Sequence, residues 1–387
     1  MQYSSARRVL LIGLFLVLAM PSQLQAKKLF RKAAKRQLKH YLVEICDWIE
    51  SGTTEESESA AWTSAGSIRA LLAGYDLAGK QQRYLNAALE WGDRLITQQR
   101  PVQTAAGNPG ALWVSRNDGL PLNSADSCIA AAALARSYVY ADKARKRVYR
   151  KALERYARVL VEGYQPQGAR KSWEGSSGWV IFRGKDGGGI AMGILDGQVS
   201  VRPSTASTAA GSLFFSQLYA LTENPEYRRL AADAVRWLIR NRRPNGQIPS
   251  ILDGTMSLQN SLGVIPYWTE AIQAAYYLLD DRDLTGWMLA ELDLTIRWLL
   301  RIQNEQGVWG EGAEKRVTTS VATLLAWFYL SADSDESIPS ALNPLWSLWL
   351  NPVHAQSFGV MVHEPTSGMV GMTAAEMIKP GITFRKK

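Results

Sequence analysis

Two carboxylic acids stand near the starts of segments rich in small residues, and they are the side chains best suited to acid–base chemistry. Asp126 lies in the run Asn-Ser-Ala-Asp-Ser, and Glu270 follows the aromatic pair Tyr267 and Trp268. Two carboxyl groups that flank one bond, one protonated and one ionised, can cleave an acetal with water. Either acid could instead serve only as a charge that favours a helix N-terminus. We predict Asp126 and Glu270 as the catalytic pair, with Tyr267 and Trp268 as a flat surface for a substrate.

The longest stretch without helical periodicity, residues 164–202, combines glycines, aromatics and charges. This composition is typical of a β-hairpin or of a lid over a binding site. Its side chains could hold the hydroxyl or carboxylate groups of a ligand, although a solvated surface hairpin would have the same composition. Together with an earlier loop and one helix start, it supplies the other predicted substrate-binding residues: Trp62, Trp113, Arg116, Trp173, Glu174, Trp179, Arg183 and Asp196.

Other kinds of chemistry lack the side chains that they need. The three histidines are His40, His354 and His363. None pairs with a cysteine or carboxylate at ligand spacing, so we expect no metal site, and the histidines do not support a catalytic triad. The glycine run at 187–189 lacks the strand, the Lys-Ser/Thr pair and the helix of a phosphate loop. We therefore expect no cofactor.

Paired helices are the elements that would position these residues. The first helix of each pair opens with small or hydroxyl residues, and the second has one apolar and one charged face. The predicted first helices start near 62, 123, 204, 266 and 317, and the second helices span 84–99, 148–163, 227–241 and 285–303. Because small residues let helices approach closely, we expect the first helices to form an inner layer and the second helices an outer layer.

A glycine turn ends the outer helices. In the clearest copy, Gly307 can adopt the left-handed conformation that stops a helix, and Trp309 can fold back on the helix just completed. Long connections follow the outer helices, at 100–122, 164–202, 242–265 and 304–316. The turns within each pair are short. The long connections should therefore lie together at one end of a ring, where they would form the rim of a bowl.

The sequence Gln303-Asn-Glu-Gln-Gly307-Val-Trp309 resembles the Gln-x-x-x-Gly-x-Trp turn of terpenoid cyclase repeats. Helix pairs with such turns are similar to the α/α-toroid superfamily, which contains six-hairpin glycosidases, polysaccharide lyases, uronyl epimerase-type domains and terpenoid cyclases. The resemblance covers roughly residues 60–331. It implies an all-α fold, an (α/α) toroid or barrel of about five to six helical hairpins. The Asp-rich run of the cyclases is absent from the inner-helix heads, since Asp280-Asp-Arg-Asp283 lies in a turn at the other end.

Among such toroids, the carbohydrate-active members fit this chain best. The resemblance implies an enzyme that acts on a polysaccharide by hydrolysis, lyase or epimerase chemistry in the bowl. Lyase or epimerase chemistry needs a base such as Tyr or His, and an Arg, Asn or Gln that neutralises a uronate carboxylate. The alternative is a non-catalytic toroid that binds a glycan or a protein in an envelope or polymer-export assembly.

The N-terminus has the pattern of an export signal, because Arg7 and Arg8 precede an apolar run at 9–20. We expect residues 1–26 to be a cleaved signal peptide, or else 9–20 to remain as a membrane anchor. In either case the protein would be exported, to the periplasm or beyond the cell. The remaining domain boundaries are then 27–331 for the toroid and 332–387 for an irregular tail that could complete the ring.

The chain has 387 residues and a formal net charge of +9, and removal of residues 1–26 leaves about +7. A basic exported protein favours acidic partners such as an acidic polysaccharide, although the charge could serve solubility alone. The helix predicted at 27–50 could contact an anionic surface through Lys28, Arg31, Lys32, Lys35 and Lys39. We expect no nucleic-acid partner. Cys46 and Cys128 could form a disulfide or remain as two buried thiols.

Overall fold

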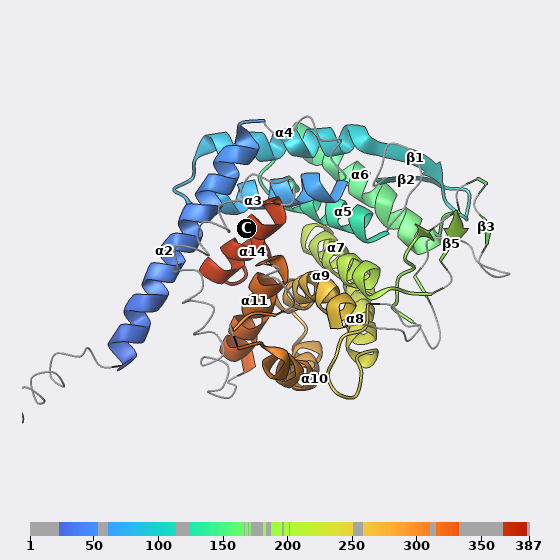
Figure 1. Cartoon of the computed structure of the whole chain (residues 1–387). Coiled ribbons are helices and arrows are strands. Elements are labelled where there is room, and N and C mark those ends of the chain that lie inside the picture. Colours follow the sequence, from blue (N-terminus) through green and yellow to red (C-terminus); the bar gives the residue numbers. More distant parts are fainter. Residues whose placement is uncertain are drawn as a thin grey trace, which may run out of the picture.

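The computed structural model contains a closed ring of inner helices. It describes residues 23–52, 61–113, 124–165, 167–168, 170–171, 181–182, 187–195, 197–200, 202–250, 258–305, 307–309, 315–332 and 367–384. The inner helices are α3 (Ala61–Leu77), α5 (Ser124–Tyr138), α7 (Thr205–Thr222), α9 (Leu258–Leu278), α11 (Lys315–Ala332) and α14 (Ser367–Ile378). Each contacts the next in this order, and α14 contacts both α11 and α3 (Figure 1). The tail predicted as irregular therefore contains the sixth inner helix.

A second layer of helices surrounds this ring. It consists of α2 (Gln23–Glu50), α4 (Gln82–Gln98), α6 (Lys143–Glu162), α8 (Pro225–Arg240) and α10 (Arg282–Ile302) (Figure 1). In α8, for example, Leu230, Trp237 and Leu238 are buried, as expected for the apolar face of an amphipathic helix. The helix predicted at 27–50 is α2, and it packs on α14 and α3. The N-terminal helix thus belongs to the outer layer, beside α14 and α3.

Small residues bring the inner helices into backbone contact. Gly368 of α14 lies so close to α3 that a Cβ atom there would stand 2.3 Å from the backbone carbon of Gly66. A larger residue at either position would force the two helices apart. The glycines, alanines and serines of the inner helices thus allow the ring to close.

The turns that end the outer helices have the predicted form. Gly307 has a φ of 79°, which favours glycine, and Gly246 after α8 has a φ of 91°. The indole of Trp309 is buried and donates a hydrogen bond of 2.7 Å to the Leu299 carbonyl of α10. Trp113 makes the same bond, also 2.7 Å, to the Leu95 carbonyl of α4. Both tryptophans therefore fix the start of a connection against the helix just completed.

Short strands accompany two of the long connections. β1 (Gln99–Gln103) and β2 (Pro109–Trp113) form an antiparallel hairpin after α4, in a connection for which no strand was predicted. Within 164–202, β4 (Ile194–Leu195) pairs antiparallel with β5 (Gln198–Val199), and β3 (Arg170–Lys171) pairs parallel with β5. A small β-hairpin in this stretch was expected.

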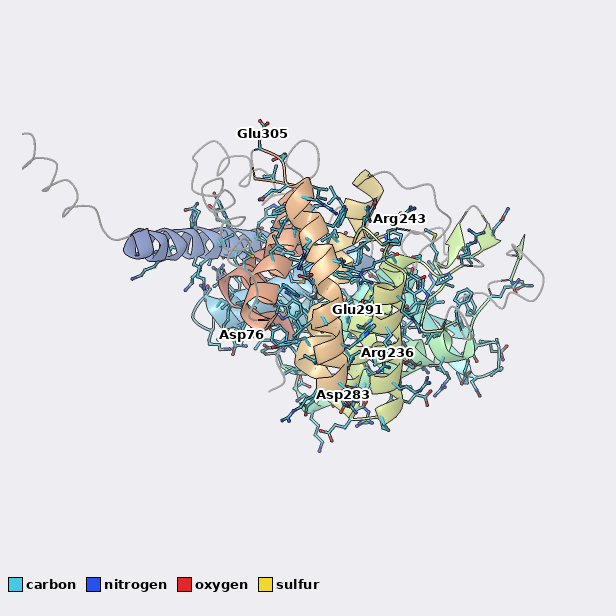
Figure 2. The ribbon with its side chains drawn as sticks, turned by 90° about the horizontal axis from the view of Figure 1, so that it is seen from below. Asp76, Arg236, Arg243, Asp283, Glu291 and Glu305 are labelled. Atoms are coloured by element: carbon cyan, nitrogen blue, oxygen red, sulfur yellow. The ribbon has the colours of Figure 1, made fainter. Side chains whose placement is uncertain are left out.

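The two ends of the ring differ in their connections. Asp283 lies in the first turn of α10 and Glu305 just after its end, and Figure 2 shows them at opposite ends of the molecule. Arg243, which follows α8, lies toward the Glu305 end in the same view. The long connections therefore share one end, called the rim end below. The short turns share the other, called the narrow end.

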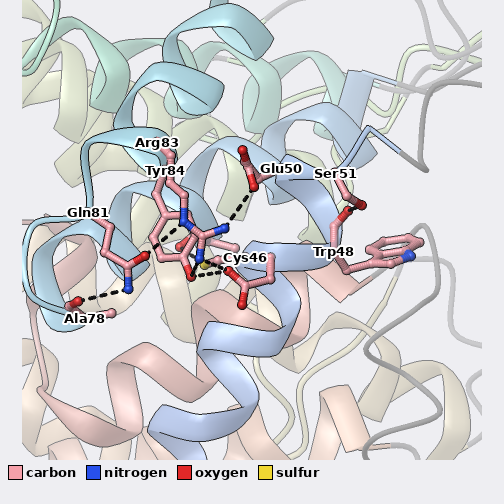
Figure 3. A network of polar contacts seen from close by, with 10 residues as sticks. Cys46, Trp48, Glu50, Ser51, Ala78, Gln81, Arg83 and Tyr84 are labelled. Carbon is pink, nitrogen blue, oxygen red and sulfur yellow. Dashed lines mark hydrogen bonds and ion pairs between the residues drawn. The ribbon is translucent and has the colours of Figure 1, made fainter.

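The C-terminal half of α2 is fastened to α4 near the narrow end. Arg83 donates to Glu50 at 3.0 Å and to Asp47 at 2.5 Å (Figure 3). The N-terminal half of α2 projects beyond the rest of the molecule (Figure 1). Cys46 on α2 and Cys128 on α5 are both free and buried, so the two-thiol alternative is confirmed.

The narrow end is closed by the residues after α14. The backbone N–H groups of Gly381 and Thr383 each donate to the Glu376 carboxylate at 2.7 Å. Phe384, in the short helix η3 (Ile382–Phe384), is buried and stacks on Tyr277 of α9 with ring centroids 6.0 Å apart. Among the described residues, the segment 381–384 thus covers the ring at the narrow end.

Candidate functional site

An ion pair crosses the interior of the ring. Arg69 of α3 donates to Glu270 of α9 at 2.6 Å, and α3 and α9 are opposite members of the inner ring. The side chains are only 3% and 6% exposed. Both charges lie more than halfway along the bowl toward the narrow end, because Glu270 follows the start of α9 by more than three turns, about 18 Å. The pair therefore forms a polar floor.

This floor retains unused hydrogen-bonding capacity. Among the described residues, Arg69 Nη2, Glu270 Oε1, Gln273 Nε2 and Ser216 Oγ are buried and have no hydrogen-bond partner. Buried polar atoms are normally paired, and each unpaired one has an energetic cost. Two donors, one acceptor and one hydroxyl group thus lack a partner at this depth of α3, α7 and α9, and several further buried side-chain atoms lack one elsewhere in the described part of the chain. A polar ligand at the floor of the bowl would satisfy them.

Exposure increases from this floor toward the rim. Glu270 is buried, Tyr267 is half-buried and Gly263 is exposed. Residues three and seven positions apart lie on one face of a helix, so these three residues form one line along α9. A Cβ atom at Gly263 would meet nothing within 4 Å. Among the described residues, the space at Gly263 is therefore open, and Tyr267 lies between Gly263 and Glu270 along α9.

Asp126 lies nearer the rim. It is in the first turn of α5 and is partly exposed, while its neighbours Ala125 and Ser127 are buried. This agrees with the predicted position at the head of an inner helix. Glu270 does not occupy such a position: α9 begins at Leu258, eight residues before the start predicted at Pro266. The prolines of helices usually stand in the first turn, but Pro266 lies inside this helix.

The other predicted substrate-binding residues are distributed differently. Trp113 and Trp268 are 1% and 0% exposed and contribute to the core rather than to an open stacking surface. Trp62 is in the first turn of α3, and its side chain is outside the described part. Outside the described residues altogether lie Arg116, Trp173, Glu174, Trp179, Arg183 and Asp196.

Three floor residues were not predicted from the sequence: Arg69, Gln273 and Ser216. A signal for Arg69 existed, because it is the one cation within the apolar and small residues at 61–77. A charged residue on a helix expected to be buried requires a partner. Gln273 and Ser216 gave no comparable signal, since small and polar residues recur throughout the inner helices.

A second charged layer lies below the floor, at the narrow end. Arg136 of α5 donates to Tyr140 at 2.8 Å and to the Ile382 carbonyl at 3.1 Å, and it pairs with Asp76 of α3 at 3.4 Å. Burial would raise the pKa of Asp76, but hydrogen bonds from Lys80 and Tyr140 hold it below its usual value. Burial raises the pKa of Glu376, and its hydrogen bonds from Thr383 and Gly381 oppose this. In the described residues, no side-chain atom of this layer is both buried and unpartnered.

Metal binding has no support in the described part of the chain, where no cluster of three His, Cys, Asp or Glu side chains could hold an ion. Two surface cavities of about 310 and 300 Å³ lie between α6 and α8, outside the ring. They contain neither Asp126 nor any floor residue. We take the buried Arg69–Glu270 pair inside the ring, with its unpartnered polar atoms, as the candidate site.

Comparison with known proteins gives similarity of structure but not of sequence. No protein-family model matches the chain, and no curated protein matches it. Cellobiose 2-epimerase from Spirochaeta thermophila aligns over 85% of this chain and 87% of its own, with 13% identity and a TM-score of 0.59. A polysaccharide lyase aligns over 88% and 97%, with 12% identity and a TM-score of 0.57.

A GH76A α-1,6-mannanase from Salegentibacter aligns over 87% of this chain and 98% of its own, with 14% identity and a TM-score of 0.52. An inactive variant of it, with two consecutive aspartates replaced, was solved in complex with α-1,6-mannotriose. These neighbours are carbohydrate-active enzymes, and at this level of identity they establish the architecture alone. Together with the closed double ring, they identify the fold of this chain as an α/α toroid.

Proposed function

We propose that the protein acts on an oligosaccharide or polysaccharide bound in the bowl. The observation that carries this proposal is the Arg69–Glu270 floor with its unpartnered polar atoms beneath Tyr267. Ligand sites commonly present a few fixed polar groups at the bottom of a concave surface. The hydroxyl groups of a sugar can both donate and accept, so they match a floor that offers Arg and Gln donors and a Glu acceptor. The carbohydrate-active neighbours agree with this substrate class.

Proton abstraction from carbon, as in lyases and epimerases, fits this floor better than hydrolysis. In this reaction Tyr267 would serve as the base, and Arg69 and Gln273 would neutralise the charge that develops on the substrate. Glu270 is bonded by the Arg69 guanidinium, which suits an orienting role more than proton donation. The only consecutive aspartates in the chain, Asp280 and Asp281, lie at the narrow end, so the chain has no pair like that of the mannanase near the bowl.

Hydrolysis by Asp126 and Glu270 remains the competing reaction. The two acids lie at different depths of the bowl, Asp126 in the first turn of α5 and Glu270 more than three turns into α9. A hydrolase needs its two carboxyl groups about 5–10 Å apart across the bond. Replacing Asp126 tests this reaction without disturbing the floor.

The test is turnover on a panel of acidic and neutral polysaccharides, with product mass and ultraviolet absorbance as readouts. A lyase gives an unsaturated product, an epimerase leaves the mass unchanged, and a hydrolase adds water. Tyr267→Phe should lower kcat by about 10²-fold or more, as expected for loss of a catalytic base. Tyr138→Phe at the narrow end is the matched control and should turn over normally. If Tyr267→Phe turned over substrate as fast as the parent, Tyr267 would not be the base. If only Asp126→Asn lost turnover, hydrolysis would be favoured.

A non-catalytic toroid is the alternative, because Arg69 and Glu270 already neutralise each other. In that case calorimetry would detect glycan or protein binding, abolished by Glu270→Gln, and no polysaccharide of the panel would be converted. Conversion of any of them by the parent, and not by Tyr267→Phe, would exclude it.

Export is also a proposal, since residues 1–22 lie outside the described part of the chain. Among the described residues, no helix is long and apolar enough to cross a bilayer. Lys32, Lys35 and Lys39 are exposed on α2, consistent with contact between its projecting half and an anionic surface. The side chains of Lys28 and Arg31 are not described. N-terminal sequencing of the mature protein should begin near Lys27, whereas an intact N-terminus in the membrane fraction would indicate an uncleaved anchor.

A further inference from the structure

Helix α6 carries a row of cations on the outer wall. The row consists of Lys143, Arg147, Lys151 and Arg155, each four residues after the last. Successive members of the row are neighbours on the helix surface, about 6 Å apart along its axis, and each step turns about 40° around the helix. Lys143, Arg147 and Lys151 are exposed, and Arg155 is half-buried. The row therefore faces solvent along most of α6.

No carboxylate neutralises this row. In the described part of the chain, none of the four cations has an ion pair or a side-chain hydrogen bond. The two acids of α6 are occupied elsewhere, because Glu154 pairs with Arg150 and Glu162 accepts from Asn108 and Thr104. Like charges one turn apart destabilise a helix, so α6 tolerates an unfavourable arrangement.

The neighbouring outer helices are built differently. On α8, Arg229 pairs with Asp233 at 3.0 Å, and on α10, Arg297 pairs with Asp293 at 2.8 Å. Both are intrahelical pairs one turn apart. The four cations of the α6 row thus differ from these paired arginines of α8 and α10.

The direction of the row connects it with the bowl. Like α4, α8 and α10, α6 follows a short turn at the narrow end and ends at a long connection at the rim end. Beyond Arg155, Arg158 donates to the Pro109 carbonyl of the β1–β2 hairpin at 2.7 Å, and this hairpin lies beside α6 (Figure 1). A chain held along the row would therefore reach the rim beside a long connection.

We propose that this row holds a linear acidic polysaccharide on the outer wall and leads it toward the bowl. The proposal rests on the proposed function, whose substrate it narrows to an anionic glycan. A gently winding row of unpaired cations can attract the regularly spaced carboxylates of a polyuronate, and this attraction raises local concentration and association rate. The row has no continuous apolar strip beside it, so insertion into a bilayer is disfavoured.

The test compares two variants that each remove two cations. Arg147→Gln/Lys151→Gln neutralises the centre of the row, whereas Arg229→Gln/Arg297→Gln removes two paired arginines. Polygalacturonate is the probe, with dextran as the neutral control, and binding is measured at low and high salt. The row variant should bind polygalacturonate about three- to tenfold more weakly at low salt, and the difference should disappear at high salt. The control variant should bind like the parent.

Equal weakening in both variants, or none in the row variant, would overturn the proposal. The proposal would also be overturned if the row variant kept its affinity for polygalacturonate but lost binding to phosphatidylglycerol vesicles or to single-stranded DNA. The row would then serve another partner. Turnover of a short oligosaccharide should be unchanged in the row variant. Loss of turnover in Tyr267→Phe tests the bowl separately, so failure of the row and failure of the proposed function are distinguishable.

Discussion

The interior of the toroid contains two charged layers that differ in one respect. In the lower layer, every buried side-chain atom of Asp76, Arg136, Tyr140 and Glu376 has a partner. In the floor, Arg69, Glu270 and Gln273 each leave a buried atom unpaired. A fully bonded network specifies and stabilises a fold, whereas an incompletely bonded one costs stability unless a ligand completes it. We therefore interpret the lower layer as structural and propose the floor as the layer that binds a ligand.

The largest effect is expected from making the lower layer apolar. Arg136→Met/Glu376→Leu would leave the N–H groups of Gly381 and Thr383 buried without an acceptor. We expect a loss of about 3–5 kcal/mol in the free energy of unfolding, measured by urea denaturation. A loss below about 1 kcal/mol would contradict the structural role of this layer.

The same change in the floor should act in the opposite way. Arg69→Met/Glu270→Leu replaces a buried ion pair by apolar side chains of similar size, which is often neutral or stabilising. We expect unchanged or higher stability, by up to about 2 kcal/mol, together with at least about tenfold weaker glycan binding. If this variant unfolds as easily as the lower-layer variant, the distinction between the layers fails.

Acidification should act through Asp76. Its folded-state pKa is lowered, so its contribution is present above its unfolded pKa of about 3.9 and is lost as the pH falls through the folded value. The parent should therefore lose stability below about pH 4 more steeply than Asp76→Asn. Thermal unfolding of both proteins from pH 6 to pH 2.5 checks this, and parallel curves would show that Asp76 does not contribute.

The smallest effects on stability and binding are expected from replacing two serines on α7. Ser216 Oγ has no partner, whereas Ser212 Oγ donates to the Ala231 carbonyl at 3.2 Å. Ser216→Ala should change stability by less than about 0.5 kcal/mol and weaken glycan binding a few-fold. Ser212→Ala should cost about 1 kcal/mol and leave binding unchanged. The reverse pattern would place the ligand elsewhere.

The architecture was predictable because its rules are local. Alternation of small-residue helices with amphipathic ones indicated two layers, and the Gly307 and Trp309 turn indicated where the long connections gather. The sixth inner helix was harder to predict from the sequence. The segment 367–378 has the small residues of an inner helix, but no outer helix directly precedes or follows it among the described residues.

The candidate site was only partly predictable because it depends on depth within the ring. The sequence singled out Glu270 by its type, but an unexpected helix start at Leu258 changed its level from the rim to the floor. Its partner Arg69 is 201 positions away, and only the closure of the ring brings the two together. No local pattern encodes such a contact.

Ring closure also has a consequence for how the chain folds. The contact between Gly66 and Gly368 joins residues near opposite ends of the sequence, and the plug at 381–384 comes later still. Contacts of such high sequence separation form slowly, because the entropy cost of closing a long loop precedes the favourable contact energy. During synthesis, α3 is made early, but α14, which packs beside it, is made only when nearly the entire chain has been translated. Until then, the floor cannot be assembled and the apolar edges of α3 and α11 stay open to other chains, so we expect refolding to be slow and sensitive to protein concentration.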